Sequence, residues 1–173
     1  MKKIIILIIF QIICNYIYSQ SKDSLLLWGK NLEYNSFLGE KKDSTQFQAT
    51  SNIFIEVLPV IQKNDKYIYY VFCFFDMNKS FITKESKELL EHEQLHFDIA
   101  ELISRKLRLR YKSLKEHSAY LNIYYNYMDT LDVYQNRYDK ETVFSIRYKE
   151  QKKWKEKIKK ELNELKEHSF IID

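Results

Sequence analysis

Residues 89–101 read LLEHEQLHFDIAE, and this stretch places His92 and His96 four positions apart with Glu93 directly after the first. In an α-helix, residues four apart lie on the same face, so both imidazoles can reach one metal ion. Glu93 lies about 100° around the helix axis, beside the open side of that ion. The pattern is HExxH, in which two neutral imidazoles bind zinc and the glutamate takes a proton from zinc-bound water.

Apolar residues at helical spacing around the motif predict that it lies on a long helix. Thr83 is the predicted N-cap, and we expect the helix to extend to about Lys115. The apolar stripe consists of Leu89, Ala100, Ile103 and Leu107 together with both histidines. The alternative is a pair of hydrogen-bonded core histidines, which is less favoured because buried imidazoles without partners carry a desolvation cost.

Two strands are predicted before this helix. Apolar residues alternate from Thr45 to Val57, which indicates a half-buried strand. The run from Tyr67 to Phe75 is apolar on both faces, which indicates a strand covered on both sides. A hairpin is the simplest connection between them.

Further helices are predicted after the motif, over residues 118–137 and 145–168. All glycines and the single proline lie at or before Pro59, so the second half of the chain has none of the usual helix breakers. The sequence therefore predicts an α+β fold, with a small N-terminal antiparallel β-sheet followed by three long helices. We expect a zincin-like arrangement with HExxH on the first long helix.

The N-terminus has the pattern of a secretory signal peptide. Lys2 and Lys3 precede an apolar run from Ile4 to Ile13, and a more polar stretch follows. We expect residues 1–19 to be cleaved and residues 20–173 to form a single metallopeptidase-like domain. An uncleaved membrane anchor is the alternative, but the run is shorter than the roughly 20 residues that span a bilayer. The mature protein is therefore expected to be secreted or periplasmic, without stable membrane insertion.

Charge and cysteine content exclude some classes of function. Removal of Lys2 and Lys3 lowers the formal net charge from +4 to +2, and the remaining charges of both signs are interleaved, so nucleic-acid binding is not expected. Loss of Cys14 with the signal leaves Cys73 as the remaining cysteine, inside an apolar run. A buried, inert thiol is expected there.

A catalytic zinc usually has three protein ligands, so a third must come from outside the motif. Asp98 and Glu101 lie about 160° and 140° around the helix from the motif and face away from the ion. Glu116 and His117 follow so late on the same helix that they lie roughly 30 Å along its axis. The chain must instead return to the histidines.

A second helix of similar length returns the chain by the same distance and brings residues 138–142 beside the histidines. Asp139 is the first candidate for the third ligand, and Glu141 is the second. Asp139 could alternatively be the N-cap of the third helix. Tyr138 could donate its hydroxyl to a developing oxyanion.

The chain resembles a bacterial family of domains of unassigned function described as predicted secreted zinc-dependent proteases. The resemblance lies in residues 89–107, YDKET at 138–142, Gln151, Trp154, residues 32–39 and residues 48–50. It implies a small metallopeptidase-like fold with His92 and His96 as ligands and Glu93 as base. Some relatives have a histidine at the position of Phe144. If that histidine binds the metal or stabilises the transition state, its replacement here affects catalysis.

These features together predict a secreted zinc-dependent hydrolase, a peptidase that acts on a peptide or protein substrate. Glu93 is the expected general base, and Zn²⁺ is the expected cofactor. The alternative is a non-catalytic secreted binding or structural module that retains the metallopeptidase scaffold. A Glu93→Gln variant that keeps zinc and loses cleavage would separate the two.

Overall fold

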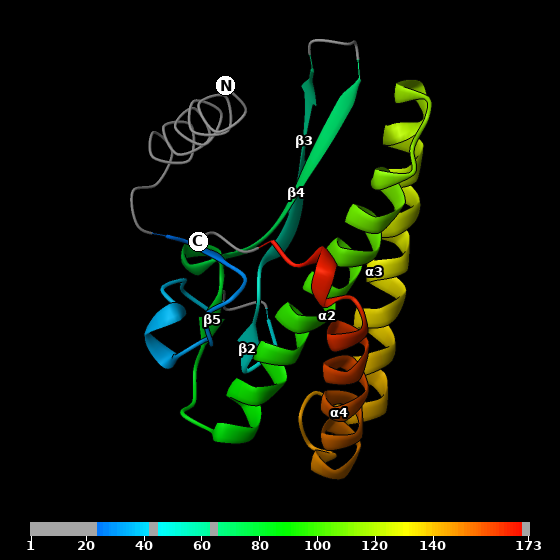
Figure 1. Cartoon of the computed structure of the whole chain (residues 1–173). Coiled ribbons are helices and arrows are strands. Elements are labelled where there is room, and N and C mark those ends of the chain that lie inside the picture. Colours follow the sequence, from blue (N-terminus) through cyan, green and yellow to red (C-terminus); the bar gives the residue numbers. More distant parts are fainter. Residues whose placement is uncertain (1–23, 42–44, 63–65, 171–173) are drawn as a thin grey trace.

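The computed structural model describes residues 24–41, 45–62 and 66–170, and the predicted signal peptide lies outside these ranges. An antiparallel sheet is followed by the long helices α2, α3 and α4 (Figure 1). The predicted α+β class, with the sheet first and the helices second, is confirmed. In the described part of the chain, every helix is too short or too polar to cross a membrane.

The main sheet has the strand order β1-β4-β3. β3 (Ile53–Ile61) and β4 (Tyr67–Asp76) form the predicted antiparallel hairpin, and the short β1 (Leu25–Leu27) pairs with the end of β4. β4 is therefore the central strand, which explains why its second half is buried. β3 continues past Val57, its predicted end, and includes Pro59, because an edge strand tolerates a residue that lacks an N–H.

A small second sheet interrupts the single strand that was predicted for residues 45–57. β2 (Ala49–Thr50) pairs with β5 (Phe81–Ile82) before β3 begins. Between β2 and β3, the backbone N–H of Asn52 donates to the hydroxyl of Ser80 at 2.8 Å. The prediction of one strand is wrong because alternation along a sequence does not reveal a change of sheet.

Helix α2 (Lys87–Lys112) has Ser86 as its N-cap, and the Ser86 hydroxyl accepts a hydrogen bond from the backbone N–H of Leu89 (3.3 Å). Thr83 was the predicted N-cap, and this prediction is wrong. Thr83 instead donates its backbone N–H and its hydroxyl to the carbonyl of Gln48, at 2.8 and 2.9 Å. This contact is distant in sequence, so local capping preferences do not reveal it.

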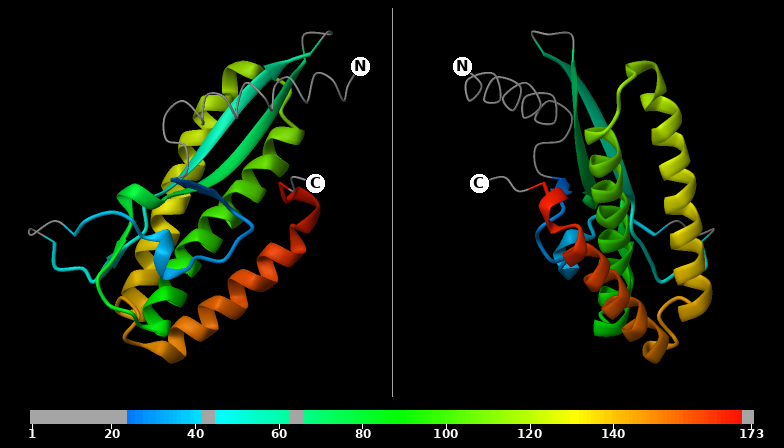
Figure 2. Two further views of the ribbon diagram at one scale, coloured as in Figure 1. Left: turned by 90° about the vertical axis from the view of Figure 1, so that its left-hand side faces the viewer. Right: turned by 45° about the vertical axis from the view of Figure 1, so that its right-hand side comes forward.

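Helices α3 (Tyr120–Thr142) and α4 (Tyr148–Glu164) follow the short 3-10 helix His117–Ala119. α3 runs back alongside α2, and α4 packs against both (Figures 1 and 2). α3 extends past Arg137, its predicted end, so Asp139 lies inside this helix. The alternative interpretation of Asp139 as the N-cap of the next helix is therefore wrong.

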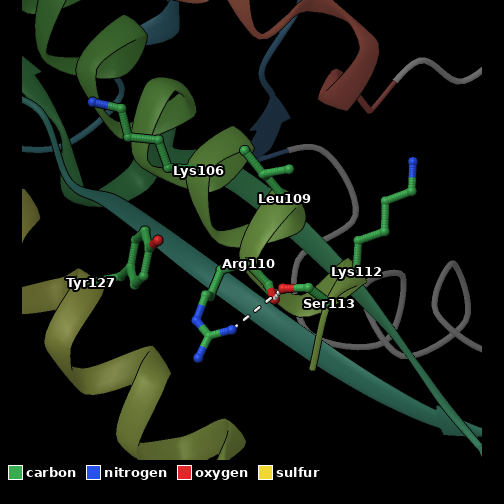
Figure 3. Close-up of a pocket in the computed structure, with 6 residues that line it drawn as sticks. All are labelled: Lys106, Leu109, Arg110, Lys112, Ser113 and Tyr127. Carbon is green, nitrogen blue, oxygen red and sulfur yellow. Dashed lines mark hydrogen bonds between the residues drawn. The ribbon is translucent and has the colours of Figure 1, made fainter. Parts of the chain in front are cut away.

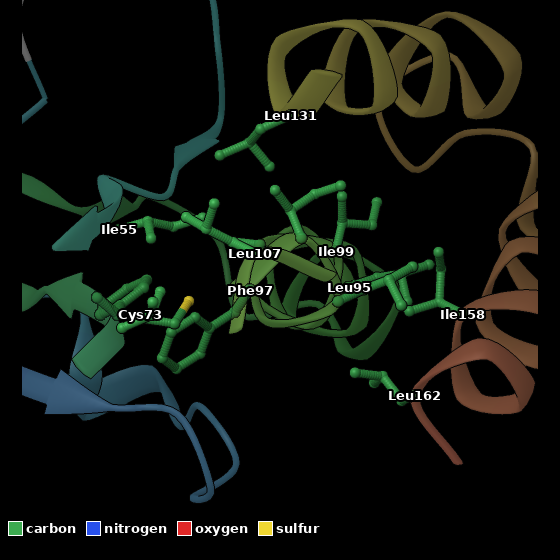
Figure 4. Close-up of a cluster of buried hydrophobic side chains, with 14 of the residues drawn as sticks. Ile55, Cys73, Leu95, Phe97, Ile99, Leu107, Leu131, Ile158 and Leu162 are labelled. Carbon is green, nitrogen blue, oxygen red and sulfur yellow. The ribbon is translucent and has the colours of Figure 1, made fainter. Parts of the chain in front are cut away.

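Helix α2 lies at the centre of the core, with the sheet on one side and α3 and α4 on the others (Figures 2 and 4). Figure 4 shows Phe97 of α2 next to Cys73 of β4, and Leu95 next to Ile158 of α4. The Cys73 thiol is fully buried, as predicted, and has no disulfide partner among the described residues. Burial raises its pKa well above the ordinary value. Side chains of α2 thus contact the sheet, α3 and α4.

A buried ion network links α2 to its neighbours. Glu101 is 1% exposed and accepts hydrogen bonds from Nε of Arg105 (2.9 Å) and Nη1 of Arg108 (2.8 Å). Arg108 also donates to the carbonyl of Val71 in β4 (2.9 Å), and Arg105 donates to the carbonyl of Leu162 in α4 (2.6 Å). Glu101 therefore serves the packing of α2 and faces away from the motif histidines.

Candidate metal centre

Three side chains from two helices converge on one point. Nε2 of His92 and Nε2 of His96 lie 3.1 Å apart on α2. Oδ1 of Asp139, from α3, lies 3.0 Å from the first of these atoms and 2.9 Å from the second. Among the described residues, His92, His96 and Asp139 are the potential ligand side chains that lie close enough together to hold one metal ion.

The antiparallel return of α3 brings Asp139 to this point. The chain turns at residues 117–119, and the end of α3 then lies beside the start of α2 (Figure 2). The structure thus places residues 138–142 near the histidines, as the helix lengths predict. His117 lies at the other end of α2, where its Nδ1 is 2.8 Å from the hydroxyl of Tyr69.

Glu141, the second candidate for the third ligand, points elsewhere. Its carboxylate accepts hydrogen bonds from Nε of Arg137 and from the indole N–H of Trp154, each at 2.7 Å. The bond from Arg137 is the largest cause of a lowered pKa of Glu141. Glu141 lies two residues after Asp139, about 200° around the helix, so the two carboxylates face different sides of α3.

Tyr138 supports the site by packing. Its side chain is fully buried, and its ring stacks on that of His92 with a centroid separation of 4.5 Å. Its hydroxyl donates to the backbone carbonyl of His92 at 3.4 Å, and burial raises the pKa of the phenol. In the structure this hydroxyl therefore points into the helix and away from solvent, and a role as oxyanion donor stays a prediction.

Two glutamines contact the outer nitrogens of the imidazoles. Gln151 of α4 donates to the carbonyl of Glu88 (2.8 Å), and its Oε1 lies 3.3 Å from Nδ1 of His92. Gln135 of α3 donates to the carbonyl of His96 (3.0 Å), and its Oε1 contacts Nδ1 of the same residue. Because a carbonyl only accepts, both amide orientations are fixed, and each imidazole must donate a proton from Nδ1.

With both protons on Nδ1, the neutral rings direct their Nε2 lone pairs at the carboxylate of Asp139. Lone pairs this close repel one another unless a proton or a metal cation lies between them. Burial lowers the pKa of His96, but its hydrogen bond to Asp139 and the charge of Glu93 outweigh burial and raise it. Burial opposes ionisation of Asp139, yet its bonds to His92 and His96 hold its pKa at about 2. The site therefore favours a positive charge among these groups.

Glu93 lies beside the converging atoms. It is 4% exposed, and its Oε2 accepts a hydrogen bond of 2.6 Å from the hydroxyl of Ser51, which directly follows β2. Hydrogen bonds from hydroxyls to ionised carboxylates are among the stronger ones in proteins. The charge of Glu93 acts on the pKa of His96, so this carboxylate is close enough to influence the centre electrostatically.

The donor atoms fit a tetrahedral zinc ion with one open position. Zinc bonds of about 2.0–2.1 Å at tetrahedral angles put ligand atoms about 3.3 Å apart. The separations of 2.9, 3.0 and 3.1 Å between the atoms of His92, His96 and Asp139 are close to this value. The side chains of His96 and Asp139 are 13% and 25% exposed, so one side of the group is open to solvent. Catalytic zinc sites keep such an opening for water or substrate.

Sequence reasoning missed Gln135 and Ser51. Gln135 lies four residues before Asp139 on the same face of α3, and this spacing is the signal that could have found it. Ser51 gives no comparable signal, because its contact with Glu93 depends on the packing of β2 against α2.

A groove of about 350 Å³ lies between α2 and α3, away from the metal centre (Figure 3). Its lining residues are Lys106, Leu109, Arg110, Lys112, Ser113 and Tyr127. Lys106 follows His96 by ten residues, which is about 15 Å along the helix. Figure 3 shows the side chains of Lys106 and Lys112 pointing away from each other, so these two cations do not converge on one ligand.

The candidate centre is thus assembled from α2, α3, α4 and the segment that follows β2. Comparisons with models of protein families, with curated proteins and with solved structures find no match for this chain, so its functional assignment rests on this geometry.

Proposed function

We propose that this chain is an exported zinc-dependent peptidase whose metal is held by His92, His96 and Asp139. The observation that carries the proposal is the convergence of two Nε2 lone pairs and one carboxylate on a single point. Gln135 and Gln151 add to it, because they fix the tautomers that metal binding requires. Hydrogen bonds of this kind typically accompany metal-binding histidines and increase their basicity.

Glu93 favours hydrolysis over other uses of the same donor set. Two histidines and one carboxylate also bind Fe(II) in oxygenases. A carboxylate held beside the ligands, but outside the group, provides the general base that metal-assisted hydrolysis needs. The position of the motif on α2, packed against an antiparallel sheet, also supports a zincin-like arrangement.

A zinc ion bound here would polarise the scissile carbonyl and acidify the attacking water. Glu93 accepts the proton of that water, and Ser51 orients the carboxylate by engaging its Oε2. The carbonyl carbon gains a bond to the water oxygen and loses its bond to nitrogen, while Glu93 passes the proton to the leaving amine. Gln135 and Gln151 keep the imidazoles oriented throughout.

The partial exposure of the centre favours a flexible peptide as substrate. The side chain of His92 is 2% exposed and that of Asp139 is 25% exposed, so access is from one side. An extended segment enters such an opening more readily than the surface of a folded domain. The signal-peptide pattern of residues 1–19 supports an activity outside the cytoplasm.

The proposal is tested with the mature chain, residues 20–173, and an unstructured protein substrate. We expect zinc-dependent cleavage that Glu93→Gln reduces by at least about 100-fold, in the range attributed to general base catalysis. Zinc content should be unchanged in this variant, because Glu93 is not a ligand. Glu91→Gln is the matched control, since Glu91 lies on the same helix and its carboxylate faces Lys155 at 3.4 Å.

Zinc binding without any Glu93-dependent cleavage would instead support the rival function, a secreted binding or structural module that retains the scaffold. Cleavage that persists unchanged in Glu93→Gln would show that the activity comes from another site or from a contaminant. Either result rejects the proposed mechanism.

A further inference from the structure

Two phenylalanine rings form an exposed pair on the segments that also carry Ser51 and Asp139. Phe47 and Phe144 are each 49% exposed, and their ring centroids lie 5.2 Å apart. Phe47 lies four residues before Ser51, whose hydroxyl binds Glu93. Phe144 lies five residues after Asp139. The pair therefore bridges the two segments that bring Ser51 and Asp139 to the centre.

The turn that carries Phe144 has an unusual backbone. Residues 143–145 have φ angles of 50°, 49° and 75°, a region that non-glycine residues seldom adopt. Hydrogen bonds hold the turn, since the N–H of Phe144 donates to the carbonyl of Asp139 (3.2 Å) and that of Arg147 to the carbonyl of Thr142 (2.8 Å). Strained conformations of this kind cluster at active sites and ligand clamps.

The same turn leaves a further apolar side chain in solvent. Ile146 is 78% exposed and follows Phe144 by two residues. Neighbouring apolar side chains that remain exposed commonly mark contact sites for other molecules. Because the hydrogen-bonded turn already fixes the backbone, a ligand that binds here does not bear the cost of ordering it.

We propose that Phe47, Phe144 and Ile146 form an apolar subsite that binds a hydrophobic side chain of the peptide substrate close to the cleaved bond. The inference rests on the proposed peptidase function and adds a substrate preference to it. An extended chain rises about 3.3 Å per residue, so Phe47 lies within about 13 Å of Ser51. A substrate side chain bound here therefore belongs to a residue within about four positions of the scissile bond, on either side of it.

The test compares kcat/KM for pairs of quenched fluorescent peptides that differ at one flanking residue, leucine against aspartate. The wild type should prefer leucine by at least about tenfold at one of these positions, as apolar pockets discriminate. Phe144→Ala and Phe47→Ala should each reduce this ratio to within about threefold. Phe144→Leu should keep most of the preference, because it retains an apolar side chain.

Tyr125→Ala is the matched control for these variants. Tyr125 is 60% exposed and pairs with the ring of Tyr124 at 5.5 Å, but it lies about 21 Å along α3 from Asp139. This variant should leave the leucine preference unchanged. Zinc content should be equimolar with the protein in all variants. If Phe144→Ala loses zinc, Phe47→Ala, on another segment, gives the deciding ratio.

An unchanged leucine preference in Phe144→Ala and Phe47→Ala, with Glu93-dependent cleavage intact, would overturn the subsite and leave the proposed function standing. A wild type without leucine preference would do the same. Absence of Glu93-dependent cleavage for every peptide would overturn the subsite and the proposed function together.

Discussion

Gln135 and Asp139 lie one helical turn apart on α3 and contact opposite nitrogens of the same imidazole, that of His96. Gln135 engages Nδ1, and Oδ1 of Asp139 lies 2.9 Å from Nε2. The same face of α3 therefore fixes the tautomer of the His96 ring through Gln135 and places the carboxylate of Asp139 opposite its Nε2. This relationship makes the candidate centre depend on the register of α3 against α2.

Gln135→Leu should weaken zinc binding by about 10–100-fold, the usual effect of removing a hydrogen-bond partner behind a metal ligand. The fold should persist, because Gln135 lies at the edge of the core and leucine is of similar size. Competition with a chromophoric chelator measures the affinity. Gln62→Leu, a change at the exposed position directly after β3, is the control and should have no effect. Equal zinc affinity in Gln135→Leu and in the control would show that Gln135 does not support the metal ligands.

Asp139→Ala should weaken zinc binding by more than about 100-fold, which exceeds the usual effect of an outer hydrogen-bond partner. Glu141→Ala should leave zinc affinity nearly unchanged, because Glu141 binds Arg137 and Trp154 instead. Isothermal titration of both metal-free variants makes the comparison. If Glu141→Ala weakened zinc binding more than Asp139→Ala, Glu141 would be the third ligand.

Ser51→Ala should reduce kcat by about tenfold or more while zinc content and KM stay close to the wild-type values, because the hydroxyl orients Glu93 and not the metal ligands. Ser51→Thr should restore most of the rate, since it retains a hydroxyl. Steady-state kinetics on one peptide provide both parameters. A change in KM alone would assign Ser51 to substrate binding instead.

Glu101→Gln should destabilise the protein by about 3 kcal/mol, because it leaves Arg105 and Arg108 buried with an uncompensated charge. Their side chains are only 6% and 11% exposed, so solvent does not replace the lost partner. Urea unfolding followed by circular dichroism measures the loss. An effect below about 1 kcal/mol, the size typical of surface pairs, would show that this network is solvated.

Val143→Gly should stabilise the protein by about 0.5–1 kcal/mol. Val143 has φ 50° and ψ 54° at the end of α3, a left-handed conformation that costs a β-branched residue about 1–2 kcal/mol. Glycine relieves this strain but gains entropy in the unfolded chain, so the net benefit is smaller. Val133→Gly, at an exposed position inside α3, is the control and should destabilise. A loss of stability in both would contradict the strained turn.

The sequence allowed prediction of those parts of the fold that depend on local periodicity and on helix length. The hairpin of β3 and β4 and the long helix around the motif follow from repeats of two and of three to four residues. The return of Asp139 to the histidines follows from rise per residue alone. These features need no knowledge of tertiary packing.

Other features depend on contacts between distant segments and could not be predicted. Next to the pairing of β2 with β5, Thr83 donates its hydroxyl to the carbonyl of Gln48, and α2 begins only at Lys87 with Ser86 as its N-cap. The contact of Ser51 with Glu93 depends on the same sheet. At Val143 the backbone adopts a left-handed conformation that a β-branched residue seldom adopts. Residue preferences therefore do not predict this turn.

The central claim is that His92, His96 and Asp139 bind one zinc ion, and a zinc K-edge X-ray absorption spectrum of the zinc-loaded mature chain tests it most directly. We predict equimolar zinc, a first shell of nitrogen and oxygen atoms at about 2.0–2.1 Å, and the outer-shell scattering of two imidazoles. A sulfur ligand, the scattering of a single imidazole, or no zinc retained after desalting would contradict the account.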